Sequence, residues 1–150
     1  MRIKQDEYTF TTGEVDEAIS IMREAARWLI NIGKPMWMIE DICREKIKNP
    51  PEEFIVLKVK GIGVAAMTLS FYDPFFWPNI NKGDSGFIHK LSIRRAFAGK
   101  GYAQKLIDKA KKLCQEKGVS FLRLDCDFHR EALCRFYERA GFKLVKQDIM

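Results

Sequence analysis

Apolar residues recur every three or four positions in four stretches of the chain, the spacing of a helix with one buried face. These stretches are Val15–Ile30, Ile39–Ile47, Ala103–Cys114 and Leu133–Ala140. Between them lie runs rich in β-forming residues, at 1–8, 54–59, 64–71, 87–93, 121–125 and 142–145. Lys60 and Gly61 separate two of these runs and predict a hairpin turn. The order predicts a hairpin followed by β-α-β-α-β, in one α/β domain that spans residues 1–150.

Local signals mark the ends of the predicted helices. Thr11 and Glu14 have the spacing of a capping box, in which each side chain takes a free amide of the first helical turn. Gly33 and Pro35 end the first helix, and Gly141 ends the last one.

The segment from Asp73 to Gly86 predicts a loop, because it contains two prolines and two glycines. It also contains three adjacent aromatic residues, Phe75, Phe76 and Trp77. Loops are usually polar, so these rings suggest a lid or the wall of a pocket. A cover over one end of the core is an equally good interpretation.

Composition narrows the class of protein. The chain has 150 residues, of which 47% are hydrophobic, and this is ordinary for a globular domain. No apolar run approaches the roughly 18–20 residues that span a bilayer, and the N-terminus has no apolar signal-peptide core, so we expect a cytoplasmic protein. The net charge of +6 favours an anionic partner and leaves nucleic acid, membrane and phosphorylated cofactor open.

The four cysteines predict no metal site. Cys43 and Cys114 fall at apolar helical positions and are expected to be packed as reduced thiols. Cys126, His129 and Cys134 form a cluster in sequence, but a structural zinc site needs four ligands and the chain offers no second close pair.

The most informative segment is the connection from Ser92 to Ala103. A predicted strand leads through Gly99-Lys100-Gly101 into a helix, and the free amides and dipole of a helix start attract phosphate. Arg94, Arg95 and Lys100 add positive charge nearby. The segment is no P-loop, because its lysine lies between the glycines, and no dinucleotide fingerprint, because Gln104 stands where a third glycine is needed.

Two motifs resemble those of the GNAT N-acetyltransferase superfamily. The segment Ala98–Ala103 resembles the acetyl-CoA motif [QR]-x-x-G-x-[GA], with Ala98 at the family's Gln/Arg position. The segment Leu133–Phe142 resembles the second motif, with its Y-E-x-x-G-F ending, and Arg130 replaces the Asn that is common before that helix. The resemblance implies an α+β sandwich with a central mixed, mostly antiparallel sheet of about six or seven strands, about four helices and a splayed cofactor cleft.

The resemblance also implies acetyl transfer from acetyl-CoA to an amine. In the family, amides of the fourth strand polarise the thioester and pair with the pantetheine arm, and these positions fall at Leu91 and Ile93. The other cofactor-binding residues implied are Arg94, Gly99, Lys100, Gly101, Tyr102, Ala103 and Arg130. Tyr137 matches the family's tyrosine, a general acid that protonates the leaving thiolate.

The resemblance is less specific about which residues form the general base and the acceptor pocket. His89 is expected on the strand face of Leu91, and histidine is a residue type that can remove a proton from an amine. In some relatives a carboxylate or an ordered water serves as the base instead. A packed histidine is an equally good interpretation of His89. The acceptor pocket is expected at Trp37, Phe76 and Trp77, with Asp73 or Asp84 as partners for an ammonium group. Each of these can equally be structural.

The leading hypothesis is a cytoplasmic N-acetyltransferase that uses acetyl-CoA on a small or peptide amine, without a metal, nucleic acid or membrane partner. Whether it forms a homodimer is open. One alternative is a non-catalytic acyl-CoA-binding or regulatory domain. Nucleic-acid binding rests on net charge alone, because the chain has no recognised reader motif.

Overall fold

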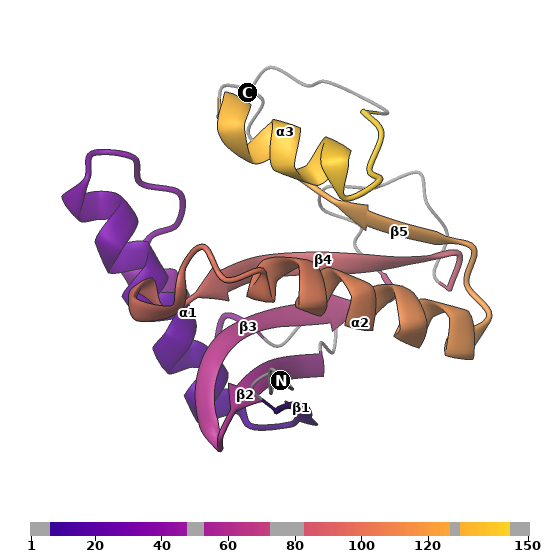
Figure 1. Ribbon diagram of the computed structural model, residues 1–150, viewed down its shortest axis with the longest axis horizontal. Coiled ribbons are helices and arrows are strands. Elements are labelled where there is room, and N and C mark those ends of the chain that lie inside the picture. The colour runs from indigo at the N-terminus through magenta and orange to yellow at the C-terminus, as the bar shows by residue number, and fades with distance from the viewer. Residues whose placement is uncertain (1–6, 48–52, 73–82, 127–129, 145–150) are drawn as a thin grey trace, which may run out of the picture.

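The computed structural model describes residues 7–47, 53–72, 83–126 and 130–144. Within these ranges the chain forms one five-stranded sheet in the order β1-β2-β3-β4-β5 (Figure 1). The strands are β1 Tyr8–Thr12, β2 Glu53–Val59, β3 Ile62–Ser70, β4 Ser85–Ile93 and β5 Phe121–Leu124. The helices are α1 Val15–Asn31, α2 Tyr102–Lys117 and α3 Glu131–Arg139, with single 3₁₀ turns at Ile39–Asp41 and Arg95–Phe97. The first four strands pair antiparallel, and β5 pairs parallel to β4.

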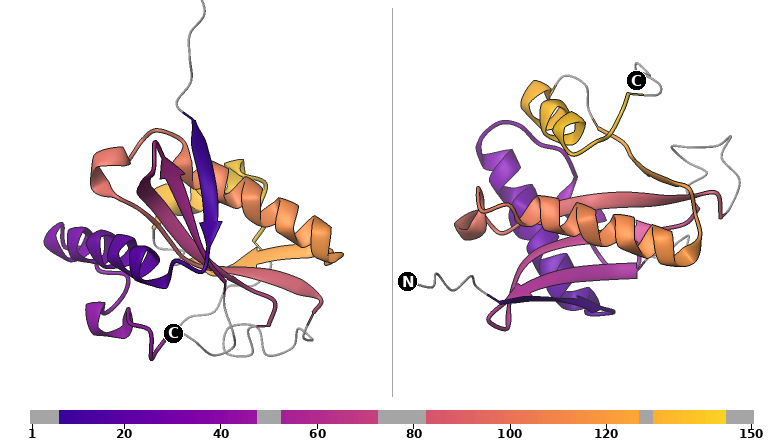
Figure 2. Two further views of the ribbon diagram at one scale, coloured as in Figure 1. Left: turned by 90° about the horizontal axis from the view of Figure 1, so that it is seen from below. Right: turned by 45° about the vertical axis from the view of Figure 1, so that its right-hand side comes forward.

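Helices α1 and α2 cover opposite faces of the sheet (Figure 2). Alternation along the strands produces two cores: Val56 and Ala66 pack toward α1, whereas Leu57 and Met67 pack toward α2. Helix α3 lies on the α2 side, where Lys111 Nζ donates to the carbonyl of Ala140 at 2.9 Å. The result is a three-layer α-β-α arrangement over most of the sheet.

The described residues contain fewer elements than the expected six or seven strands and four helices. The stretch predicted as a helix over 39–47 forms only the 3₁₀ turn at Ile39–Asp41. Here the amide of Ile42 donates to the carbonyl of Ile39 at 3.0 Å, which closes the 3₁₀ turn, and the Arg23 guanidinium of α1 donates to the carbonyls of Ile39 and Ile42 at 3.2 and 3.1 Å. The expected last strand is also not formed at residues 142–144.

The capping box expected at Thr11 and Glu14 is wrong. Thr11 belongs to β1, and its Oγ1 donates to Glu14 Oε2 at 2.7 Å. The same carboxylate accepts from Lys58 Nζ of β2 at 2.8 Å, so no side chain caps α1. These two donors, Lys58 first, lower the pKa of Glu14. An ion pair between Glu14, at the start of α1, and Lys58 of β2 has replaced the local helix-capping interaction.

Strand β4 is interrupted in its middle by a bulge. Its register against β3 shifts between Ser92, which pairs with Ala66, and His89, which pairs with Thr68. Two residues of β4 therefore face one residue of β3, and Lys90 has a positive φ of 52°. The pairing with β5 covers only the first half of β4 and ends at Ile88 opposite Leu124. Within the described ranges the two parallel strands thus separate just before the bulge.

Candidate active site

The second half of β4 carries the backbone groups expected to meet a cofactor. The amide of Arg94 donates to the carbonyl of Val64 in β3 at 2.8 Å. Because peptide groups alternate along a strand, the amides of Ile93 and Leu91 are directed to the other edge, where β5 has already diverged. The side chains of Leu91 and Ile93 pack against the α2-side core, which holds this edge in place.

A glycine turn joins this strand to the start of α2. Gly99 and Gly101 have φ values of 77° and 82°, which side chains with a Cβ rarely adopt. A Cβ at either glycine would meet nothing within 4 Å, so conformation rather than crowding requires glycine here. In the described part of the chain, no backbone hydrogen bond is made by the amides from Gly99 to Ala103. These amides and the helix dipole form a site that fits an anion such as a pyrophosphate.

The arginines expected beside this turn interact with α1. Arg94 donates to the Gly63 carbonyl at 2.9 Å and to Glu17 and Glu24 at 3.3 Å. The guanidinium of Arg95 lies 4.1 Å from the centroid of the Trp28 ring. Sequence reasoning missed the partners in α1 because Glu17, Glu24 and Trp28 lie more than 60 residues away along the chain.

Among the three expected basic residues, Lys100 is the one that lies in the turn itself. The residue is exposed, and its Nζ is 5.8 Å from the Phe97 ring centroid. Tyr102 is buried at the first position of α2, where its ring contacts Phe97 at 6.5 Å between centroids. Lys100 therefore supplies a charge at the turn, and Tyr102 anchors the helix start.

Tyr137 lies on α3 within an aromatic cluster. Its ring centroid is 5.4 Å from that of Phe136 and 5.9 Å from that of Phe142. Burial is the first cause that raises the pKa of Tyr137 well above its ordinary value, followed by Cys126, Asp125 and Cys134. The phenol is therefore protonated at neutral pH, as a general acid must be. The contribution of Asp125 was missed from the sequence, because Asp125 stood inside the run expected as a strand over 121–125, whereas β5 ends at Leu124.

The expectation that His89 shares a face with Leu91 is wrong. His89 pairs with Thr68, which alternates with Ala66 on the α1 side, whereas Leu91 packs on the α2 side. The bulge at Lys90 inserts one residue between them and reverses the alternation. His89 is half-buried, and its carbonyl accepts from Thr68 Oγ1 at 3.4 Å.

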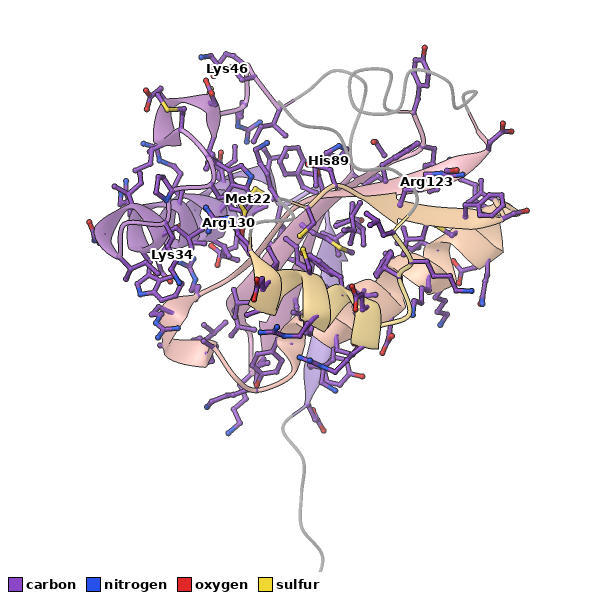
Figure 3. The ribbon with its side chains drawn as sticks, turned by 90° about the horizontal axis from the view of Figure 1, so that it is seen from above. Met22, Lys34, Lys46, His89, Arg123 and Arg130 are labelled. Atoms are coloured by element: carbon purple, nitrogen blue, oxygen red, sulfur yellow. The ribbon has the colours of Figure 1, made fainter. Side chains whose placement is uncertain are left out.

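Arg130 connects the start of α3 to the loop after α1 (Figure 3). Its Nη2 donates to the carbonyls of Lys34 and Pro35 at 2.9 and 2.5 Å. Trp37, in the same loop, is half-buried against the α1-side core. The Arg130 side chain thus links the start of α3, which packs on the α2 side, to the loop after α1.

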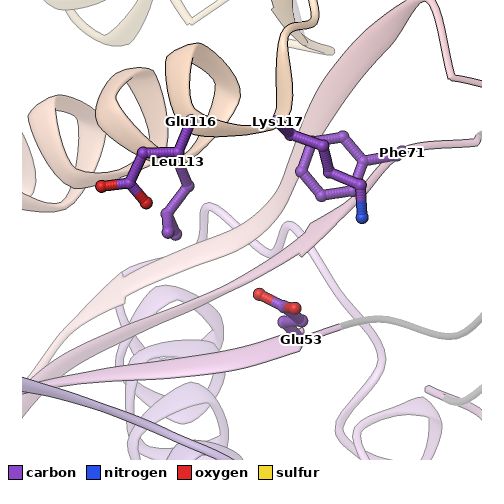
Figure 4. A pocket seen from close by; sticks show the side chains of 5 residues that line it. All are labelled: Glu53, Phe71, Leu113, Glu116 and Lys117. Atoms are coloured by element: carbon purple, nitrogen blue, oxygen red, sulfur yellow. The ribbon is translucent and has the colours of Figure 1, made fainter.

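Three residues expected at the acceptor pocket, Asp73, Phe76 and Trp77, fall outside the described ranges, as does His129, which was considered and rejected as a metal ligand. Asp84 is described and exposed. A hollow of about 310 Å³ lies at the other end of α2, lined by Glu53, Phe71, Leu113, Glu116 and Lys117 (Figure 4). Because the anion turn begins α2 and Lys117 ends it, this hollow is separate from the candidate active site. No helix in the described ranges is long and apolar enough to cross a membrane.

Comparison with known proteins decides the family. The profile of the Acetyltransferase (GNAT) family matches residues 19–142, most of the chain. This chain belongs to the GNAT acetyltransferase family. An uncharacterized N-acetyltransferase, YesJ of Bacillus subtilis (strain 168), is 26% identical to this chain, and the match covers 90% of this chain and 79% of that protein. The chain is therefore a GNAT-family N-acetyltransferase with the expected α+β class of fold.

Solved structures agree on the fold. A GNAT-family acetyltransferase from Listeria monocytogenes aligns with a TM-score of 0.74 and 23% identity, covering 94% of this chain and 89% of that one. The aminoglycoside N-acetyltransferase AAC(6')-Iy, in complex with CoA, aligns with a TM-score of 0.69 and 10% identity, covering 100% of this chain and 97% of that one. The family uses acetyl-CoA.

Proposed function

We propose that this chain transfers the acetyl group of acetyl-CoA to a primary amine of a small molecule or peptide, by direct attack of the amine. One observation carries the proposal: the diverging edge of β4 is followed, after the 3₁₀ turn at Arg95–Phe97, by a glycine turn whose amides make no backbone hydrogen bond in the described residues. An extended, phosphate-bearing cofactor needs both features in sequence.

Different backbone amides of the chain bind different parts of the cofactor. The amides of Leu91 and Ile93 pair with the pantetheine arm as a strand would, and those from Gly99 to Ala103 take the pyrophosphate. Lys100 adds a screened charge at the solvent side. Acetyl-CoA supplies an activated acyl group and a thiolate leaving group. A strand amide directed at the acyl oxygen stabilises the charge that develops there.

Tyr137 is the proposed general acid. Its protonated phenol donates the proton that the leaving sulfur gains as the carbon–sulfur bond breaks. The raised pKa keeps the phenol protonated and also makes it a weaker acid. Arg94 and Arg130 were expected to bind the cofactor, but their hydrogen bonds to Gly63, Lys34 and Pro35 favour a role in holding the surrounding elements.

The proposal assigns proton removal from the amine to a carboxylate or an ordered water. Both alternatives were open from the family resemblance, whereas the position of His89 across the sheet from Leu91 gives it no support as the base. The acceptor side is proposed at the loop that contains Trp37, which Arg130 holds close to α3.

The test is Tyr137→Phe, with Tyr8→Phe on the exposed edge strand as matched control. Thermal shift with acetyl-CoA first establishes binding, since a ligand of the native state raises Tm. CoA release is then measured on a panel of amines. We expect Tyr137→Phe to lower kcat about 10²–10⁴-fold with little change in KM for acetyl-CoA. An unchanged kcat contradicts the acid role, and binding without turnover on any amine favours a non-catalytic acyl-CoA-binding domain.

A further inference from the structure

Two cysteines from different elements meet beside the candidate active site. Cys126 follows the end of β5, and Cys134 lies in α3. Their sulfur atoms are 3.4 Å apart, and both side chains are half-buried. The other two cysteines are separate: Cys114 is buried against Gly86, and the Sγ of Cys43 lies 3.6 Å from the carbonyl of Glu40.

We propose that Cys126 and Cys134 form a thiol–disulfide exchange site that reacts with low-molecular-weight disulfides. A disulfide bond requires a sulfur–sulfur distance of about 2.05 Å, so the two atoms must approach by little more than 1 Å. One of them lies on a short segment after a strand, and the other on a helix with no fully buried residue.

The exchange balances without any further reactant. One cysteine thiolate attacks a sulfur of the small disulfide, forms a mixed disulfide and releases one small thiol. The second cysteine thiolate attacks the protein sulfur of that mixed disulfide and releases the second small thiol. The protein has then lost two protons and two electrons and gained the Cys126–Cys134 bond. The small disulfide has been reduced to two thiols.

Closure of this bond has a consequence for Tyr137. Cys134 precedes Tyr137 by three residues on α3, and both thiols are close enough to influence the pKa of the phenol. The bond ties α3 to the end of β5 and fixes the position from which Tyr137 acts. A displacement of about 1 Å at a reacting group can lower a rate about 10²-fold. We therefore expect the disulfide form to be less active, a step that rests on the proposed function.

Peptide mapping tests the site independently of activity. The reduced protein is incubated with glutathione disulfide, alkylated and digested with trypsin. Arg123, Arg130 and Arg135 place the two cysteines in separate peptides, 124–130 and 131–135. We expect these peptides to be joined by a disulfide, with a loss of about 2 Da from the intact protein and its reversal by dithiothreitol. Cys43→Ser, the matched control, should behave like the wild type.

The single variants separate exchange from simple thiol modification. Cys134→Ser should accumulate a stable glutathione adduct on Cys126, and Cys126→Ser should accumulate one on Cys134. Two stable adducts on the wild type, or no reaction at either thiol, would overturn the exchange site. Activity is then compared between the oxidised and reduced forms of the wild type. A joined peptide pair with equal kcat in both forms would overturn the link to Tyr137 and leave the proposed acetyl transfer intact.

Discussion

Arg94 is the residue whose predicted role the structure changes most. We therefore consider Arg94→Met, which removes the guanidinium and retains an apolar stem of similar length. In the native protein this guanidinium joins β3, through the Gly63 carbonyl, to two carboxylates of α1. A Cβ at Gly63 would lie 2.2 Å from Glu17 Oε1, so α1 and β3 approach one another closely at this contact.

The expected loss follows from these contacts. The side chain of Arg94 is 20% exposed, whereas Glu17 and Glu24 are about 40% exposed, so both ion pairs are partly screened. Each pair is worth about 0.5–1 kcal/mol at this exposure, and the hydrogen bond to the Gly63 carbonyl about 1 kcal/mol. Arg94→Met should therefore lower the free energy of unfolding by about 2–3 kcal/mol. The control, Arg44→Met, removes one exposed pair with Asp16 and should cost much less stability than Arg94→Met, because solvent screens this pair.

Urea unfolding, analysed with a common m-value, measures the free energy of unfolding of both variants. Titration with acetyl-CoA measures the affinity of the native proteins for this ligand. We expect Arg94→Met to raise the Kd for acetyl-CoA less than about threefold, whereas Lys100→Ala should raise it more and weaken its salt dependence. The reasoning is refuted if Arg94→Met is no less stable than Arg44→Met. It is also refuted if Arg94→Met loses acetyl-CoA affinity while its free energy of unfolding is unchanged.

Two further predictions concern the scaffold. A Cβ at Gly86 would lie 2.5 Å from the Sγ of Cys114, so Gly86→Ala should lower the free energy of unfolding by about 1–3 kcal/mol. Cys114→Ala should relieve much of this loss in the double variant. Urea-unfolding energies that are additive for the two substitutions would contradict the contact. The lowered pKa of Glu14 means that its interactions stabilise the protein above the unfolded-state pKa and are lost as pH falls through the folded-state value. The Tm difference between wild type and Glu14→Gln should therefore shrink between pH 6 and pH 3, and a constant difference would contradict the ion pair with Lys58.

Much of the fold could be predicted because its signals are local. The hairpin, the α2 helix and the α3 helix follow from apolar spacing, and their observed bounds agree with it. The turn at Gly99 and Gly101 was equally visible, because a left-handed backbone requires glycine whatever surrounds it. By contrast, the stretch expected as a helix over 39–47 forms only a 3₁₀ turn, and its carbonyls at Ile39 and Ile42 accept from Arg23 on a different element, a contact that apolar spacing does not report.

The sequence by itself thus determined the order of the elements, the anion-binding turn and the resemblance to the GNAT family. Only the tertiary structure decided which groups meet there. A single inserted residue at Lys90 separates His89 from Leu91, because each added residue reverses the alternation of a strand. Arg94 contacts two carboxylates of α1 because folding brings together side chains whose spacing along the chain carries no signal of contact. Cys126 and Cys134 were visible as a cluster in sequence, but only the packing of α3 beside the end of β5 brings their sulfur atoms together.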